Sequence, residues 1–227
     1  MIKVIFFDWG HTFTGSGFTD AREPINKLLK PYGLDWDVFF PYWRSLYQLR
    51  SSRWIKTDEE FHVWLGRILQ KRDLPLEQIQ KVIVDSHRIP KENIELIKKI
   101  KEDYKVGLLT NNVQEWVERV LRNYKIEDLF DVVIVSSRVG VRKPEGRIFY
   151  EALKSLSAKP EEAVFVSDEV SEDLVGAKAC GMRIIWLDTG IENEWKQQER
   201  ELAEFLKPDA IIKNLIEVPP IIKKWER

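Results

Sequence analysis

Five short apolar runs predict the strands of a parallel sheet. They are rich in β-branched residues and lack a clean alternation of apolar and polar positions, which is typical of strands buried on both faces. The runs are Lys3–Phe7, Lys105–Leu109, Asp131–Val135, Ala163–Val166 and Arg183–Leu187, and Asp209–Ile212 is a candidate edge strand. Amphipathic stretches between them predict helices at Lys91–Glu102, Gln114–Asn123, Gly146–Leu156 and Ser171–Cys180. This alternation predicts an α/β fold whose parallel sheet is covered by helices on both faces.

The interval from Gly15 to Ile89 breaks this alternation. Its pattern is mainly helical, with predicted helices at Ala21–Leu29, Trp36–Arg50, Thr57–Lys71 and Leu76–Ser86. Thr57 followed by Glu60 resembles a capping box, and Pro75–Glu77 suits a helix start. The interval is too long for a loop. We therefore predict a helical-bundle cap at residues 15–89, inserted after the first strand of a core formed by residues 1–14 and 90–227.

The predicted cap is rich in aromatic residues, most of which we interpret as core packing. They are Trp36, Phe39, Phe40, Tyr42, Trp43, Tyr47, Trp54, Phe61 and Trp64.

Composition narrows the class of protein further. The 227 residues include 36 basic and 37 acidic side chains, scattered along the chain, so nothing favours a nucleic-acid or membrane partner. The only cysteine, Cys180, excludes an intrachain disulfide and favours reducing surroundings. No signal-peptide pattern precedes the first strand. A membrane-spanning helix needs about 18 consecutive apolar residues, and no apolar run is nearly that long. We expect a soluble cytoplasmic protein.

Polar residues that could carry chemistry follow four of the predicted strands. The segments are Asp8-Trp9-Gly10-His11-Thr12, Thr110-Asn111-Asn112, Arg142-Lys143-Pro144, and Ser167-Asp168 continuing to Asp173. The carboxyl ends of parallel strands converge on one crevice, where ligands bind. Together the segments supply carboxylates, a hydroxyl, amides and an ammonium group. This set suits the binding of a metal and a phosphate and an attack on phosphorus.

The order and strand context of these segments resemble the four motifs of the haloacid dehalogenase-like hydrolases. The flanks VGVRKPEGRIFYEAL and DLVGAKACGMRIIWLDTG are similar to the third and fourth motif regions, and the inserted helices resemble the family's C1 cap. The resemblance covers nearly the whole chain. It implies a Rossmann-like three-layer α/β/α core with a helical cap. It also implies a Mg²⁺-dependent phosphatase that acts on a small phosphorylated metabolite.

The resemblance also assigns roles in phosphate chemistry. Asp8 matches the nucleophile, which would form an aspartyl-phosphate and split hydrolysis into two displacements. Lys143 matches the lysine that neutralises charge on the phosphate and on Asp8. The residues that would bind phosphate are Trp9, Gly10, Thr110, Asn111 and Lys143.

The metal site implied by the resemblance consists of oxygen ligands. Asp8, Asp168 and the backbone carbonyl of Gly10 would bind Mg²⁺, which prefers such hard ligands. Asp173 matches the second acid of the fourth motif and would orient Lys143 or a metal-bound water from the second shell of the site. We interpret Glu169 and Glu172 as solvated acids at a helix start.

The sequence departs from the family beside the nucleophile. Hydrolytic members usually carry a second Asp two residues after the nucleophile, where this chain has Gly10, and losing a positioned acid/base costs about 10²–10⁴ in rate. His11 is a candidate acid/base in its place, or a histidine accommodated in the turn. Ser167 stands where the family often has a Gly, just before the acid of the fourth motif. Arg138 either faces the site entrance or is solvated, and Arg142 is left out of the site.

Two other functions stay open from the sequence. A catalytically weakened phosphate-binding or regulatory protein is compatible with Gly10 and His11. A 2-haloacid dehalogenase is less favoured, because its chemistry gives Asp168 no metal to hold and the family Tyr expected at position 10 is absent.

Overall fold

The computed structural model describes residues 1–15, 21–71, 73–190 and 194–227. Within these ranges, six parallel strands form one sheet in the order β3-β2-β1-β4-β5-β6. The strands are β1 (Val4–Phe7), β2 (Lys105–Thr110), β3 (Val132–Val135), β4 (Ala163–Ser167), β5 (Arg183–Leu187) and β6 (Ala210–Ile212). The predicted strands, including the edge strand, are therefore confirmed.

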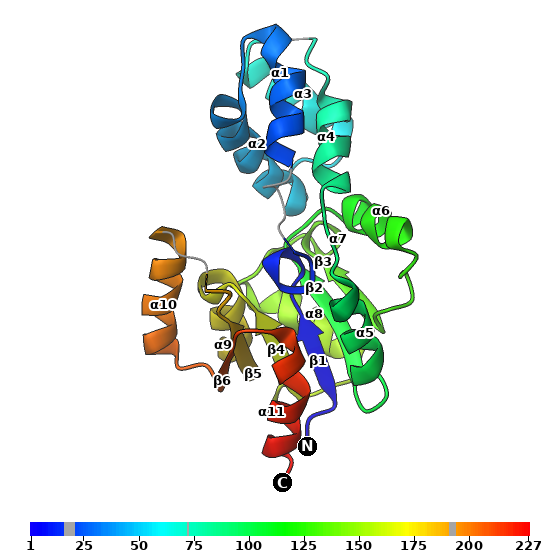
Figure 1. Cartoon of the computed structure of the whole chain (residues 1–227), viewed down its shortest axis with the longest axis vertical. Helices are drawn as coiled ribbons and strands as arrows, with labels where there is room; N and C mark the ends of the chain where they lie inside the picture. Colours follow the sequence, from blue (N-terminus) through cyan, green and yellow to red (C-terminus); the bar gives the residue numbers. More distant parts are fainter. Residues whose placement is uncertain (16–20, 72, 191–193) are drawn as a thin grey trace.

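Helices cover both faces of the sheet, as Figure 1 shows. Side chains of β1 alternate between two apolar clusters, with Ile5 and Phe7 in one and Val4 and Phe6 in the other. The first cluster includes residues of α5 (Lys91–Ile100), α6 (Gln114–Tyr124) and α11 (Val218–Trp225). The second includes residues of α8 (Gly146–Ser155), α9 (Val175–Ala179) and α10 (Glu194–Leu206). The three-layer α/β/α prediction is confirmed.

Two parts of the helical layers differ from the sequence prediction. The predicted helix Ser171–Cys180 begins instead with a wider turn, Val170–Leu174, closed by the Leu174 N–H on the Glu169 carbonyl at 3.3 Å, and continues as α9. The helices α7 (Ser136–Val139), α10 and α11 were not predicted. In the described residues, no helix is long and apolar enough to cross a membrane.

In the part of the predicted cap that the structure describes, four α-helices lie above the sheet (Figure 1): α1 (Arg22–Leu29), α2 (Trp36–Ser51), α3 (Asp58–Ile68) and α4 (Leu76–Asp85). The Thr57 hydroxyl accepts from the Glu60 N–H at 3.1 Å, as a capping box requires. The Glu60 carboxylate accepts from the Lys56 N–H at 3.0 Å, so the reciprocal bond is shifted by one residue from the prediction.

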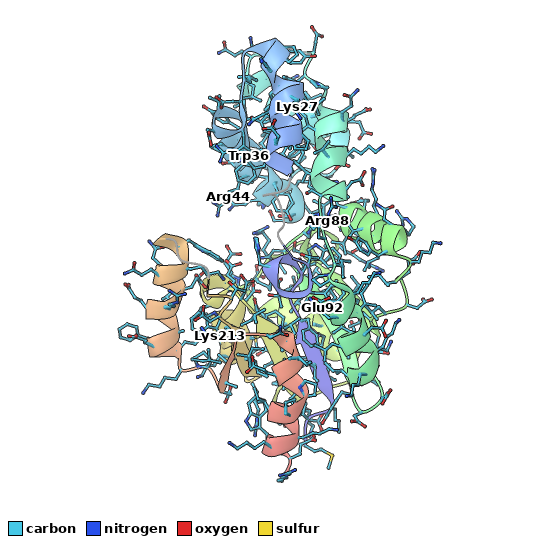
Figure 2. All side chains as sticks on the ribbon, in the orientation of Figure 1. Lys27, Trp36, Arg44, Arg88, Glu92 and Lys213 are labelled. Carbon is cyan, nitrogen blue, oxygen red and sulfur yellow. The ribbon has the colours of Figure 1, made fainter. Side chains whose placement is uncertain are left out.

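The connections between cap and core lie side by side. The Gly15 N–H donates to the Arg88 carbonyl at 2.6 Å, and Figure 2 labels Arg88 between the cap and the sheet. This bond joins residues next to the two predicted domain boundaries, at 14/15 and 89/90.

Aromatic side chains build the cap and also join it to the core. Phe39, Trp43 and Phe61 are fully buried, as predicted from their pattern. Trp116 of α6 stacks on Trp43, with ring centroids 5.8 Å apart, and on Tyr47 at 5.6 Å. The core packing interpretation does not hold for three further rings, which are substantially exposed: Tyr42, Trp54 and Trp64.

Candidate active site

Asp8 and Asp168 lie at the carboxyl ends of two neighbouring strands, β1 and β4. The strand order reverses between these strands, which is where open α/β sheets bind ligands. Both side chains are buried, with 8% of Asp8 and 2% of Asp168 exposed. Burial raises the pKa of Asp8, and the charge of Asp168 adds to the rise, whereas Lys143 opposes it. The structure thus brings together two of the predicted carboxylates.

Lys143 lies between two carboxylates. Its Nζ is 2.6 Å from Oδ1 of Asp8 and 2.7 Å from Oδ2 of Asp173. Burial alone would lower the pKa of Lys143, but the charges of Asp173 and Asp8 raise it above the ordinary lysine value. The lysine is therefore a permanent cation beside the predicted nucleophile.

Asp173 is held on its other side by Ser167. The Ser167 hydroxyl donates to Oδ2 of Asp173 at 2.6 Å. Burial raises the pKa of Asp173 to about 7, and the charge of Asp8 adds to the rise, whereas Lys143 and the Ser167 hydroxyl oppose it. The sequence had suggested no role for Ser167, yet its hydroxyl fixes the acid that orients Lys143.

Asn111 ties the end of β2 to the loop that carries Lys143. Its Oδ1 accepts from the Lys143 N–H at 2.8 Å, and its Nδ2 donates to the Lys143 carbonyl at 3.1 Å. The same Nδ2 donates to Glu172 at 2.9 Å. The side chain of Asn111 is thus used to position Lys143. Thr110, the last residue of β2, is buried beside it.

The loop after β1 leaves room at position 10. Trp9 is buried between Phe13 and His87, with ring centroids 5.9 Å from each, and its backbone N–H lowers the pKa of Asp8. Gly10 has an ordinary φ of −70°, and an added Cβ would meet nothing within 4 Å. His11 is exposed and adopts a positive φ of 54°. The backbone therefore does not require glycine at position 10.

Asp168 is held by two residues to which the sequence analysis gave no role. The Thr12 hydroxyl donates to Oδ1 of Asp168 at 3.0 Å, and Nζ of Lys196 lies 2.7 Å from Oδ2. Lys196 is 2% exposed and belongs to α10. Its neighbour in the helix, Glu199, accepts from the Ser171 N–H at 3.1 Å and from the Val170 N–H. Helical periodicity could have located α10, but a lysine gives no signal that it will be buried.

The cap contributes directly to the edge of the site. The Tyr47 hydroxyl of α2 donates to the Asn111 carbonyl at 2.9 Å. Burial raises the pKa of Tyr47, so its hydroxyl remains a donor. Arg142 donates to the Ser51 hydroxyl and lies 3.5 Å from Glu172. Arg142, which we had left out of the site, therefore bridges the cap and the core.

The acids after Asp168 are not the solvated pair that we expected. Burial and the nearby charges of Asp173 and Glu172 raise the pKa of Glu169 to about 9. The Glu172 carboxylate accepts a hydrogen bond from Nδ2 of Asn111. Arg138, by contrast, is exposed on α7.

The donor set suits Mg²⁺. In the described ranges, no group of three His, Cys, Asp or Glu side chains could hold a metal ion by itself. Mg²⁺ usually needs only one or two carboxylates, with water and substrate oxygens completing its shell. Asp8 and Asp168 offer two such carboxylates, whose like charges already oppose each other in a buried site. The Gly10 carbonyl would add a hard oxygen.

Comparison with known proteins agrees with this fold. The haloacid dehalogenase-like hydrolase family matches residues 45–187, and the chain belongs to this family of hydrolases. It is 26% identical to a glyceraldehyde 3-phosphate phosphatase of Pyrococcus furiosus, over 100% of this chain and 94% of the relative. The protein of that name from Methanothermobacter thermautotrophicus is 30% identical, over 90% of this chain and 92% of the relative.

A solved structure shares the fold. The haloacid dehalogenase-type hydrolase YfnB of Bacillus subtilis, bound to magnesium, superposes with a TM-score of 0.72 at 17% identity. The alignment covers 98% of this chain and 99% of YfnB. The fold predicted by the resemblance is thus confirmed.

Proposed function

We propose that this protein is a Mg²⁺-dependent phosphatase that hydrolyses a small phosphorylated metabolite through an aspartyl-phosphate on Asp8. The observation that carries the proposal is the buried contact of Lys143 with both Asp8 and Asp173. Asp8 and Asp168 follow the neighbouring strands β1 and β4, between which the strand order reverses. The relatives named as phosphatases support the same reaction class.

Each of the buried site residues has a separate role in the proposed reaction. The Asp8 carboxylate attacks phosphorus, and the bond from phosphorus to the leaving oxygen breaks. Lys143 offsets the negative charge that collects between the nucleophile and the phosphoryl oxygens. Asp173 and Ser167 hold the lysine in place. Water then attacks the aspartyl-phosphate and regenerates Asp8.

Proton transfer is the weaker part of this site. Gly10 has no side chain to protonate the leaving oxygen or to activate water, so solvent or the exposed His11 would carry these protons. We therefore expect both the attack on phosphorus and the hydrolysis of the intermediate to be slower than with an acid at this position.

The proposed metal site consists of Asp8, Asp168 and the Gly10 carbonyl. Bound there, Mg²⁺ would withdraw charge from the phosphoryl oxygens and help to orient them. The magnesium bound to YfnB supports this choice of metal.

The cap favours a small substrate. Tyr47 and Ser51 of α2 contact Asn111 and Arg142, so the cap lies against the loops that surround the crevice. A cap in this place encloses the reacting groups and limits the size of the molecule beyond the phosphate. The names of the relatives make glyceraldehyde 3-phosphate the first substrate to test.

A phosphate-release assay tests the proposal. Purified protein is incubated with Mg²⁺ and a panel of phosphomonoesters that includes glyceraldehyde 3-phosphate, with EDTA in a parallel series. We expect metal-dependent turnover of at least one small phosphate ester, and none in an Asp8→Asn variant prepared in the same way. Absence of turnover across the panel contradicts the proposal.

A second candidate function is phosphate binding without efficient turnover, which the missing acid/base at Gly10 favours. Capture of a phosphoryl analogue such as beryllium fluoride, without multiple turnovers on any ester, would distinguish it. Dehalogenation is a weaker alternative, because it leaves Asp168 without a metal to hold. Metal-independent halide release from a 2-haloacid would support it.

A further inference from the structure

Asp168, a proposed Mg²⁺ ligand, already has a cation beside it. Nζ of Lys196 is 2.7 Å from Oδ2 of Asp168 and 2.9 Å from its backbone carbonyl. The Thr12 hydroxyl occupies Oδ1 at 3.0 Å. The ammonium group also lies 4.3 Å from the ring centroid of Trp195. Both carboxylate oxygens of Asp168 are therefore engaged, one of them by a buried positive charge.

We propose that Lys196 is an intramolecular competitor of Mg²⁺ for Asp168. In the metal-free protein its ammonium group neutralises this carboxylate, and metal binding displaces the ammonium group from Oδ2. The inference rests on the proposed function, because it assumes that Mg²⁺ binds at Asp8 and Asp168. It goes beyond that function by assigning α10 a role in setting the Mg²⁺ concentration at which the site is loaded.

The physical reason is the cost of a buried charge. A buried carboxylate that loses its partner strongly destabilises a protein. Asp8 shares Lys143 with Asp173, so that lysine does not neutralise Asp168. Lys196 supplies the missing charge until a metal does. Mg²⁺ can bind tightly only when the lysine is displaced. The apparent dissociation constant for Mg²⁺ is therefore the intrinsic constant divided by the fraction of molecules in which Lys196 has left Asp168.

The helix can stay in place while Lys196 moves. Glu199 holds its first half through the Ser171 N–H at 3.1 Å, and Ala203 is buried in the core. Lys178 binds its far end through the carbonyls of Leu206 and Lys207 at 2.5 and 2.8 Å. Figure 1 shows α10 at the side of the sheet away from α5 and α6. The flexible four-carbon chain of a lysine can therefore leave Asp168 without unfolding α10.

Calorimetric titration with Mg²⁺ tests the competition. Lys196→Gln removes the charge but keeps a polar side chain, and we expect it to bind Mg²⁺ on the order of tenfold more tightly than wild type. Lys178→Gln is the matched control, because it loosens the other end of α10 without touching Asp168, and its dissociation constant should equal that of wild type. Asp168→Asn defines which part of the binding belongs to this site.

A second measurement uses the unaltered protein and so does not depend on the folding of a variant. Lysines are acylated briefly with and without saturating Mg²⁺, and the modified positions are quantified by mass spectrometry. We expect Lys196 to be protected without metal and labelled several-fold more with it. The exposed Lys178 serves as the internal reference, with unchanged labelling.

The outcomes separate this inference from the proposed function. If binding depends on Asp168 but is equal in wild type and Lys196→Gln, the competition is overturned and the proposed metal site stands. Unchanged Lys196 labelling at saturating Mg²⁺ also overturns the competition. Absence of Asp168-dependent Mg²⁺ binding in wild type and in Lys196→Gln overturns both.

Discussion

The carboxylates that follow β1 and β4 each meet a buried lysine, but the two lysines come from different kinds of segment. Lys143 lies in a loop of the recognised motifs, fixed by Asn111 and placed between Asp8 and Asp173. Lys196 reaches Asp168 from α10, outside those motifs. The surroundings of Asp8, the proposed nucleophile, are thus built from motif residues, whereas those of Asp168, a proposed metal ligand, include a residue from a peripheral helix.

This difference predicts different behaviour during the reaction. Lys143 is bound to two carboxylates and would stay in place while Asp8 attacks. Lys196 occupies an oxygen that the proposed metal needs, so it would leave before the reaction begins. In the proposed mechanism, the same residue type, at nearly equal distances from its carboxylates, would therefore have a catalytic role beside Asp8 and a competing role beside Asp168.

Replacement of the nucleophile has the largest expected effect. Asp8→Asn should lower kcat/KM by at least about 10⁴-fold, because the carboxylate that forms the acyl-phosphate bond in the proposed mechanism is lost. The matched control is Asp188→Asn, which changes another carboxylate at the same edge of the sheet, directly after β5. It should keep nearly full activity. Comparable losses in the two variants would contradict the assignment of Asp8.

The lysines can be compared by the same substitution. Lys143→Gln should lower kcat about 10²–10³-fold at saturating Mg²⁺, because the charge at the nucleophile is lost. Lys196→Gln should lose much less under the same conditions, because metal has already replaced its charge. Steady-state kinetics at several Mg²⁺ concentrations provides the measurement. Equal losses of kcat in the two variants at saturating Mg²⁺ would contradict the proposed difference between Lys143 and Lys196.

Restoring the family's acid should raise turnover. Gly10→Asp is expected to increase kcat by about 10²-fold, because a positioned acid/base is worth at least that much. The backbone at position 10 has an ordinary φ and open space for a Cβ, so the substitution should fold without strain. Gly10→Asn is the control with similar size and no titratable group. Equal rates for wild type, Asn and Asp would show that His11 or water already performs this step.

The smallest expected effect concerns the pH dependence of stability. Burial would raise the pKa of Asp188, but hydrogen bonds from Lys213, the Gly190 N–H and Arg200 lower it to about 2. An unfolded Asp has a pKa of about 3.9. A lowered folded pKa stabilises the protein above the unfolded value, and this contribution is lost as pH falls through about 4 to 2.

Asp188→Asn should therefore reduce the free energy of unfolding at pH 7 by at most about 1 kcal/mol, because the exposed Lys213 is screened by water. The difference from wild type should disappear near pH 2. Urea unfolding across this pH range measures it, and a constant difference down to pH 2 would contradict the role of the ionised carboxylate.

Most of the core could be predicted from the sequence because its signals are local. Buried parallel strands read as short apolar runs, and Asp8, Lys143 and Asp168 each lie just after one or in a motif beside it. Ser167 and Thr12 were missed as partners because their hydroxyls act through contacts with Asp173 and Asp168 that only the folded sheet creates. Their spacing along the chain, by itself, does not indicate these contacts.

The peripheral helices were harder to predict for a different reason. Residues 194–206 are dominated by charged and polar side chains, which describe a solvated helix or a loop equally well. The burial of Lys196 depends on the position of Asp168, which lies 28 residues away in the sequence. The burial of Lys196 therefore follows from a tertiary charge contact, which local sequence patterns do not indicate.

Trapping of the phosphorylated enzyme tests the central claim most directly. Wild-type protein is mixed with a turned-over phosphoester and Mg²⁺, quenched in acid within the first turnovers, and mapped by mass spectrometry. We predict one phosphoryl group on Asp8 of the wild-type protein and none in the Asp8→Asn variant. Turnover without phosphorylation of Asp8, or with the phosphoryl group on another residue, would contradict the account.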